Sequence, residues 1–323
     1  MSPAISELVS TAHSPFTDPH VHVWGWEIPV YLFLGGFTAG IMVLSGWALW
    51  KGRRNLRPFR TTFALASSGL FILGLATISL GMLALFLDLG HKPYVWRLYL
   101  TMKPWSPMSW GAWILLLVYP VLAAGVLLDP PRALLRYAPA LEPVVQWMEA
   151  RPLVRHAVGF ASIVTGVALG IYTGILLSAL GARPLWSSGL LGPLFLVSGL
   201  STAAAFAHWA SPEPEERVHL AWLDNLFLSI ELGLIGLLLI GLLTATEAHA
   251  EAARLLRGGP YTAVFWVGVV FMGILLPLVI QSLAATHRVI HTPIAPILVI
   301  LGGLALRFVI VSAGQLSHWP RLS

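Results

Sequence analysis

Cysteine is absent from the 323-residue sequence. This absence excludes disulfide bonds, thiol catalysis and cysteine-ligated iron–sulfur clusters for the chain.

Charged residues are scarce as well, at 10% of the chain, whereas a soluble domain usually carries about 25%. Hydrophobic residues make up 57% and recur in long stretches from end to end, so the solvent of this chain is lipid. The sequence pI of about 9.8 does not indicate nucleic-acid binding, because the basic residues stand in short loops between apolar stretches, where they act as topology signals.

Eight apolar stretches are each near or above the ~20 residues that a helix needs to cross the hydrocarbon core. We therefore predict an all-α integral membrane protein with a single transmembrane domain over residues 1–323, and both termini on one side. The predicted spans are Trp26–Trp50, Thr62–Asp88, Ser109–Leu128, His156–Leu180, Gly189–Trp209, Ala221–Thr246, Tyr261–Ala285 and Pro293–Gln315.

Basic residues predict the orientation. We call the side on which the first span begins the N-terminal face, and the other side the opposite face. Seven Lys and Arg flank spans on the N-terminal face and eleven on the opposite face, with none before the first span and five directly after it. Because cytoplasmic loops are enriched in Lys and Arg, we expect both termini, including the segment 1–25, to be periplasmic in a bacterial inner membrane.

Glycine recurs every four residues in the fourth span, at Gly166, Gly170 and Gly174. These residues share one helix face, and a face without side chains lets another helix approach closely. The pattern predicts that the fourth span is central in the bundle.

Four polar motifs lie at span ends that share the N-terminal face, because the chain direction alternates. They hold Glu27 with Tyr31, Asp88 with Lys92, Ser106 with Ser109, and Tyr172 with Arg183. A pocket of carboxylates, phenols and cations under aromatic cover suits a neutral aromatic headgroup that takes up or releases protons. The alternative is that Glu27 and Asp88 pair with Lys92 and Arg183 and fix the helix ends.

A second polar group lies deeper. Asp224 stands at the start of the sixth predicted span, Glu231 follows seven residues later on the same face, and Arg307 lies inside the eighth. Ionisable side chains within a membrane cost a few kcal/mol each and are candidates for function. The sequence leaves two interpretations open, a buried Glu231–Arg307 ion pair and a proton path from the opposite face.

Histidine is present eleven times, but never at the middle of a predicted span. A haem held by two histidines in the membrane core therefore lacks ligands. One alternative is a haem near the opposite face, held by two of His156, His208, His219, His287 and His291. We expect no haem, metal or iron–sulfur cluster in this chain.

Seven segments together resemble the family of polysulfide reductase and NrfD membrane subunits. They cover nearly the whole sequence in order: Trp26–Gly36, Asp88–Pro93, Ser106–Trp113, Tyr172–Ser178, Ala182–Trp186, Ser198–Thr202, and Gly302–Arg307 with Gly314-Gln315. The resemblance implies two packed four-helix bundles and a menaquinone or ubiquinone bound near the outer face. It also implies electron transfer between this quinone and an iron–sulfur partner, which serves a molybdopterin or multihaem catalytic subunit.

Transferred residue by residue, the resemblance implies a docking loop at residues 89–107 and a quinone site. The implied site residues are Trp26, Glu27, Tyr31, Asp88, Lys92, Tyr172 and Arg183, with Glu27 or Asp88 as proton carrier and Tyr172 as headgroup donor. Some relatives have a histidine or asparagine where this chain has Ile28 and Tyr31.

Two other functions compete with this hypothesis. A secondary transporter or ion channel is favoured by the buried Asp224, Glu231 and Arg307, but the chain lacks paired spans broken by glycine and proline, which are typical of transporters. A haem-bearing quinol cytochrome is the third, and a reduced-minus-oxidised spectrum would distinguish it.

Overall fold

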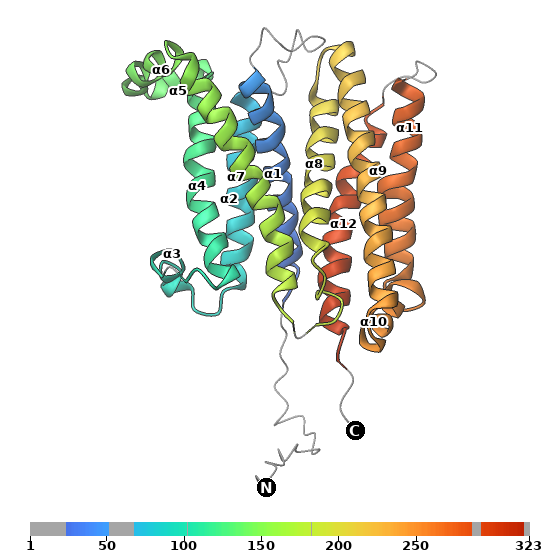
Figure 1. Cartoon of the computed structure of the whole chain (residues 1–323). Coiled ribbons are helices and arrows are strands. Elements are labelled where there is room, and N and C mark those ends of the chain that lie inside the picture. Colours follow the sequence, from blue (N-terminus) through green and yellow to red (C-terminus); the bar gives the residue numbers. More distant parts are fainter. Residues whose placement is uncertain (1–23, 52–67, 102, 182, 286–291, 320–323) are drawn as a thin grey trace.

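A computed structural model of the protein describes residues 24–51, 68–101, 103–181, 183–285 and 292–319. Eight helical segments in this part are long and apolar enough to cross a membrane, which confirms the predicted all-α membrane fold (Figure 1). They are α1 (Glu27–Lys51), α2 (Ser68–Asp88), α4 (Pro107–Leu127), α7 (Pro152–Ser178), α8 (Leu191–Ala210), α9 (Pro214–Thr244), the continuous pair η3 (Val264–Leu275) and α11 (Leu276–Ala285), and α12 (Ile294–Leu316).

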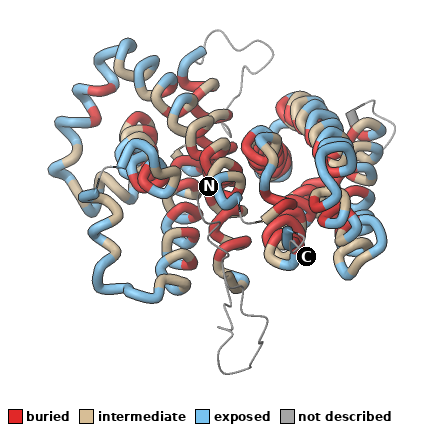
Figure 2. The backbone as a smooth tube through the Cα atoms, turned by 60° about the horizontal axis from the view of Figure 1, so that its bottom comes forward, coloured by how far each residue is buried: buried red, intermediate tan, exposed pale blue. Residues whose placement is uncertain are grey.

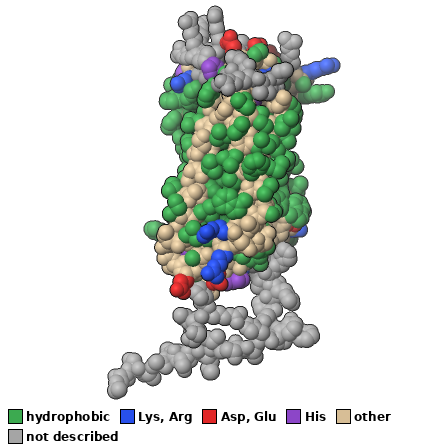
Figure 3. Space-filling model, turned by 90° about the vertical axis from the view of Figure 1, so that its right-hand side faces the viewer, with side chains coloured by type: hydrophobic (Ala, Val, Ile, Leu, Met, Phe, Trp, Pro, Cys, Tyr) green, Lys and Arg blue, Asp and Glu red, His purple; other side chains and the backbone are tan. Residues whose placement is uncertain are grey.

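Short helices lie at both ends of the bundle (Figure 1). The N-terminal face carries η1 (Lys92–Tyr94), α3 (Arg97–Leu100) and α10 (Glu247–Arg257), and the opposite face carries α5 (Arg132–Tyr137), η2 (Pro139–Leu141) and α6 (Glu142–Glu149). On the face shown in Figure 3, hydrophobic side chains cover much of the mid-height, while charged and histidine side chains gather at the two ends.

The start of α1 and the end of α12 meet on the N-terminal face. The Trp24 backbone N–H donates to Gln315 Oε1 at 3.3 Å, and Gln315 Nε2 donates to the Trp24 carbonyl at 3.1 Å. An even number of spans requires both helix ends to lie on the same face. The periplasmic orientation stays a prediction, and the segment 1–23 and several basic residues on which it rests lie outside the described residues.

α1 is the central helix of the fold. It packs against α2 and α7 on one side and against α8 and α12 on the other, while α2 and α4 pack within the first half and α9, η3 and α11 within the second. Gly40 of α1 faces the carbonyl of Gly199 on α8 so closely that a methyl group would overlap it. Buried residues therefore concentrate where the helices face one another (Figure 2). The division into two four-helix bundles stays a prediction, because this shared interface is extensive.

The glycine face of α7 lies between α1 and α8. A methyl group on Gly166 would meet the Ala39 carbonyl of α1, and one on Gly174 would overlap the backbone of Leu191 on α8. The predicted close approach of other helices to this face is confirmed, whereas the central helix is α1.

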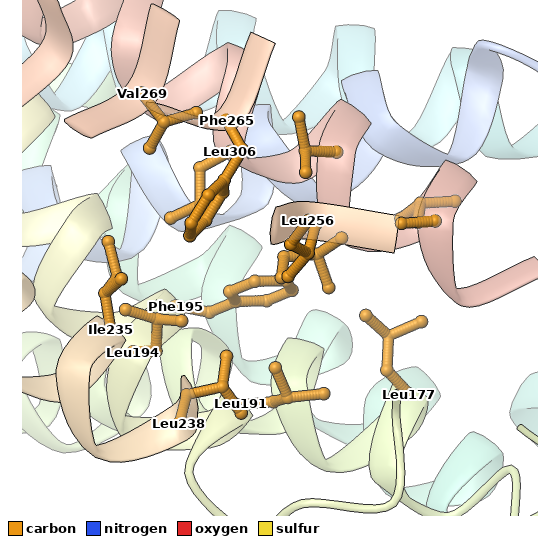
Figure 4. Packing of buried hydrophobic residues seen from close by; sticks show 14 of the residues in the cluster. Leu177, Leu191, Leu194, Phe195, Ile235, Leu238, Leu256, Phe265, Val269 and Leu306 are labelled. Atoms are coloured by element: carbon orange, nitrogen blue, oxygen red, sulfur yellow. The ribbon is translucent and has the colours of Figure 1, made fainter. Parts of the chain in front are cut away.

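One apolar core fills the second half and continues into α1, α2 and α7. Phe195 of α8 and Phe265 of η3 lie in it together with leucines from α8, α9, α10 and α12 (Figure 4). Phe195 matters for the polar groups described below, because its ring and its carbonyl both contact a buried arginine.

Two spans differ from their predicted form. α9 begins at Pro214 rather than Ala221, because the first turn with Glu215, Glu216 and Arg217 continues the helix beyond the apolar stretch. Asp224 is therefore ten residues inside the helix rather than at its start. The seventh span is wound as a π-helix over Val264–Leu275, a rare geometry that apolar periodicity does not reveal.

Candidate functional site

Three phenols from separate elements converge near the N-terminal face. Tyr31 of α1 is 2% exposed and Tyr172 of α7 is 5% exposed. Tyr172 and Tyr99 of α3 both lie within electrostatic range of the Tyr31 hydroxyl. We call Tyr31, Tyr99 and Tyr172 the tyrosine site. Two of its members were predicted, and the structure brings these two together.

Glycines on α2 and α4 make room for these rings. A methyl group on Gly111 of α4 would overlap the Tyr172 phenol, so that this ring lies on bare backbone. A methyl group on Gly81 of α2 would stand 3.7 Å from Cδ2 of Tyr31. The phenols are therefore fixed by packing between helices, with no hydrogen bond needed to orient them.

The three hydroxyls donate no hydrogen bond within the part of the sequence that the structure describes. Buried tyrosine hydroxyls usually have a partner, so these are donors available to a ligand. Tyr99 lies outside the spans, and its burial, together with the nearby Tyr119, raises the pKa of its phenol. It therefore stays protonated and able to donate at neutral pH.

The other predicted residues surround the N-terminal end of this site at different depths. Glu27 is the first residue of α1, one turn before Tyr31, and its carboxylate folds over Gly25. Asp88 is the half-buried last residue of α2. Lys92 in η1 and Trp26 are exposed, so they lie at the rim rather than in a buried pocket.

Arg183 has other partners than those expected from the sequence. Its Nη1 donates to the Ser317 carbonyl at 3.0 Å and lies 2.8 Å from Nδ1 of His318. Trp186 follows, fully buried, with its Nε1 donating to the Ile310 carbonyl at 2.8 Å. This segment thus attaches the α7–α8 connection to the end of α12. The proposed role of Arg183 in the quinone site stays a prediction that no contact within the described residues supports.

Sequence reasoning missed Tyr99 and Gly111. Tyr99 lies in the loop 89–107, which the sequence marked only as a docking surface. The loop is held over α4 by Ser109, whose hydroxyl donates to the Thr101 carbonyl and accepts from the Lys103 N–H. A second tyrosine shortly after the Lys-Pro-Tyr turn was the available signal, but nothing in the sequence indicates that the loop folds back over the helices.

The second polar group is fully buried in the second half of the protein. Asp224 of α9 accepts hydrogen bonds from Ser201 Oγ at 2.9 Å and from Gln281 Nε2 at 2.7 Å. The three side chains come from α9, α8 and α11 and have no exposed surface. The Asp224 carboxylate is therefore satisfied inside the protein.

Arg307 occupies the other end of this group. Its Nη1 donates to Ser198 Oγ at 2.6 Å and its Nη2 to the Phe195 carbonyl at 2.9 Å, and its guanidinium lies 4.4 Å from the Phe195 ring centroid. Ser198 and Arg307 both lie within electrostatic range of the Glu231 carboxylate. Among the described residues the carboxylate and the guanidinium form no direct ion pair, and the Ser198 hydroxyl is hydrogen-bonded to both groups.

The Asp224 group and the Arg307 group share the helices α8 and α9. On α8, Ser201 of the first group is one turn from Ser198 of the second, and on α9, Asp224 is two turns from Glu231. We call Ser198, Ser201, Asp224, Glu231, Gln281 and Arg307 the polar network. The structure thus brings together the three residues of the predicted proton path, whose role stays a prediction. No group of three or more potential metal ligands occurs within the described ranges.

Comparison with known proteins identifies the family. The family model described as polysulphide reductase, NrfD, matches residues 13–318. The protein belongs to the NrfD family. It is 31% identical to a polysulfide reductase chain of Wolinella succinogenes, over 91% of this protein and 94% of the relative, and 30% identical to NrfD of Escherichia coli, over 91% and 96%.

A more distant relative is a selenate reductase subunit of Mesobacillus selenatarsenatis. It is 24% identical over 89% of this protein and 73% of the relative. The names of the relatives thus differ in the reductase substrate, while the matched region stays nearly the full length of this protein. The similarity therefore extends over the part of this protein that holds the eight candidate spans.

Proposed function

We propose that this NrfD-family protein is the quinone-reactive membrane subunit of a bacterial respiratory oxidoreductase. The observation that carries the proposal is the tyrosine site, with three converging phenols whose hydroxyls have no partner in the described part of the sequence. Membership of a family whose members include parts of polysulfide and selenate reductases supports it.

The residues of the tyrosine site fit a quinone headgroup. A quinone ring is flat and apolar with carbonyl oxygens that only accept hydrogen bonds, and phenol O–H groups are matching donors. When bound, a quinone supplies two-electron, two-proton redox chemistry. Tyr172 and Tyr31 would hold the oxygens, and the bare backbone at Gly111 would let the ring approach α4.

Glu27 is the best-placed proton carrier in this proposal. It stands one turn from Tyr31 at the membrane surface, so that its carboxylate can exchange protons between a headgroup oxygen and the water outside. Asp88, at the end of α2 on the same face, is the second candidate. Trp26 and Lys92 would border the entrance.

Electrons need a partner, because this sequence has no cysteine to ligate an iron–sulfur cluster. The loop 89–107 exposes Trp105, at 95%, together with Trp96 and Leu100. Large exposed apolar side chains of this kind mark interaction sites. We therefore expect an iron–sulfur subunit to dock on this loop and to link the protein to a molybdopterin or multihaem catalytic subunit.

The polar network supports coupling of quinone turnover to proton translocation. Its carboxylates and hydroxyls follow one another along α8 and α9 through the interior. Asp224→Asn should lower the number of protons moved per electron in liposomes, while quinone turnover continues. An unchanged number of protons moved per electron would count against this role and would indicate that the polar network only stabilises the fold.

The whole proposal is tested by purifying the tagged protein in mild detergent and identifying co-purifying proteins and lipids by mass spectrometry. We expect an iron–sulfur protein and a quinone in stoichiometric amounts. A protein that purifies alone and without quinone, and that transports a solute when reconstituted in liposomes, would favour the transporter.

A further inference from the structure

A cavity of about 220 Å³ lies at the opposite face, far from the tyrosine site along the helices. It is formed where α8 ends and where α9 and α12 begin. Its lining residues are His208, Trp209, Arg217, Thr292, Pro293 and Pro296. Neither the proposed quinone site nor the polar network includes any of these residues.

Arg217 is the charged group of this cavity. Its Nε donates to the Ser211 carbonyl at 2.7 Å, which fixes the side chain, while its two Nη nitrogens donate to no residue in the described part of the sequence. The neighbouring Glu216 is buried and does not line the cavity, since its Oε2 accepts from the Ser211 hydroxyl at 2.7 Å. The cavity therefore presents a positioned, partly unused guanidinium.

The surroundings place this guanidinium at the edge of the apolar belt. Trp209 is exposed beside it, and tryptophan is typical of the level of lipid headgroups. The volume is below the ~300–1,000 Å³ of pockets that enclose a drug-sized molecule, so it fits a small polar group rather than a whole lipid or quinone. Acyl chains attached to that group could lie on the lipid-facing surface outside.

We propose that this cavity binds a phosphate group, carried by an anionic phospholipid headgroup or free in solution. The planar guanidinium of Arg217 matches two phosphate oxygens, and the Thr292 hydroxyl is a further donor in the lining. Basic pockets between spans at the cytoplasmic side bind anionic headgroups in this way.

Binding here would act on the helices that carry the polar network. Arg217 precedes Asp224 by seven residues, about 10 Å along α9, and His208 follows Ser201 by seven residues on α8. A bound phosphate would thus hold together the ends of α8, α9 and α12. Its loss should lower the unfolding temperature without requiring any change in quinone chemistry.

The test compares lipid binding to the purified full-length protein by native mass spectrometry, with phosphatidylglycerol and phosphatidylcholine as probes. Arg217→Gln should weaken phosphatidylglycerol binding about tenfold or more, as expected for lost charged hydrogen bonds. Arg151→Gln is the matched control, because Arg151 is an exposed arginine on the same face that stacks on Trp147 at 4.3 Å. It should bind like the wild type.

Two further experiments distinguish a lipid headgroup from free phosphate as the ligand, and the charge of Arg217 from the shape of its guanidinium as the reason for binding. Inorganic phosphate that raises the unfolding temperature at low millimolar concentration, with no preference between the two lipids, would assign the site to free phosphate. Arg217→Lys keeps the charge but loses the two-pronged guanidinium, so it should weaken phosphatidylglycerol binding less than Arg217→Gln does. The proposal is overturned if Arg217→Gln binds both probes like the wild type, or if Arg217→Lys loses as much as Arg217→Gln.

Discussion

The two halves of the protein treat their buried polar groups in opposite ways. The tyrosine site in the first half has phenols with no partner among the described residues, held by ring packing on glycines of neighbouring helices. The polar network in the second half has carboxylates and a guanidinium with hydrogen-bond partners on α8 and α11. Unused phenol donors can recognise a ligand, whereas a network whose charged groups are hydrogen-bonded, with only Arg307 Nε and Gln281 Oε1 left over among the described residues, fixes the protein or passes protons within it.

The use of neutral phenols at one site and of hydrogen-bonded charges at the other follows from the free-energy cost of burying an unpaired charge. A neutral phenol without a partner is tolerated near the membrane surface, but an unpaired charge in the middle of a bundle costs several kcal/mol, of the order of 3–5 when a partner is removed. The comparison therefore predicts that variants of the polar network alter stability first, and that variants of the tyrosine site alter quinone turnover first.

Arg307→Met should have the largest effect on stability. It leaves the buried Glu231 carboxylate without its nearby positive charge and should lower the free energy of unfolding by about 3–5 kcal/mol, the cost of an uncompensated buried charge. Thermal unfolding in detergent measures this loss. The double variant with Glu231→Gln should recover part of the stability, and equal unfolding temperatures for the single and double variants would contradict the coupling.

Glu27→Gln should lower quinol oxidation by about a hundredfold, at the low end of what a positioned proton carrier contributes. The complex should still assemble, because Glu27 lies at a helix end and its carboxylate bonds to no other element among the described residues. Steady-state turnover with a soluble quinol analogue measures this. If Asp88→Asn shows the loss and Glu27→Gln does not, Asp88 is the carrier.

Tyr172→Phe should lower kcat/KM for the quinol about 2- to 13-fold, the range for one net hydrogen bond of 0.5–1.5 kcal/mol. Its unfolding temperature should not change, since the phenol donates to no described residue. Tyr137→Phe is the matched control, because Tyr137 is 86% exposed and stands in α5 on the opposite face. Equal kcat/KM values in the two variants would show that the Tyr172 hydroxyl does not bind the quinol.

Ser201→Ala should have the smallest effect. Hydrogen bonds between helices in membranes average about 0.6 kcal/mol and reach about 1.7, so the loss of the bond to Asp224 should be detectable only as a small shift in unfolding temperature. Ser229→Ala is its control, because among the described residues the Ser229 hydroxyl bonds only to the Asn225 carbonyl of its own helix. Equal unfolding temperatures of the two variants would show that the Ser201–Asp224 hydrogen bond adds no measurable stability.

The sequence predicted the spans well because length and hydropathy determine them directly. It also predicted the convergence of Tyr31 and Tyr172, since alternating chain direction fixes which helix ends share a face. It could not predict that Tyr99 folds back over α4 or that Arg183 turns to Ser317, because loop paths depend on contacts between distant residues. The early start of α9 was missed because a helix can continue past the apolar stretch on charged first-turn residues.

The measurement that tests the central claim most directly is quinone retention by the protein purified in nanodiscs. Extracted quinone is quantified for the wild type, for the double variant Tyr31→Phe with Tyr172→Phe, and for Tyr137→Phe. We expect stoichiometric quinone in the wild type and in Tyr137→Phe, and a clear loss in the double variant. Equal retention in all three proteins would show that the quinone binds elsewhere and would contradict the tyrosine site.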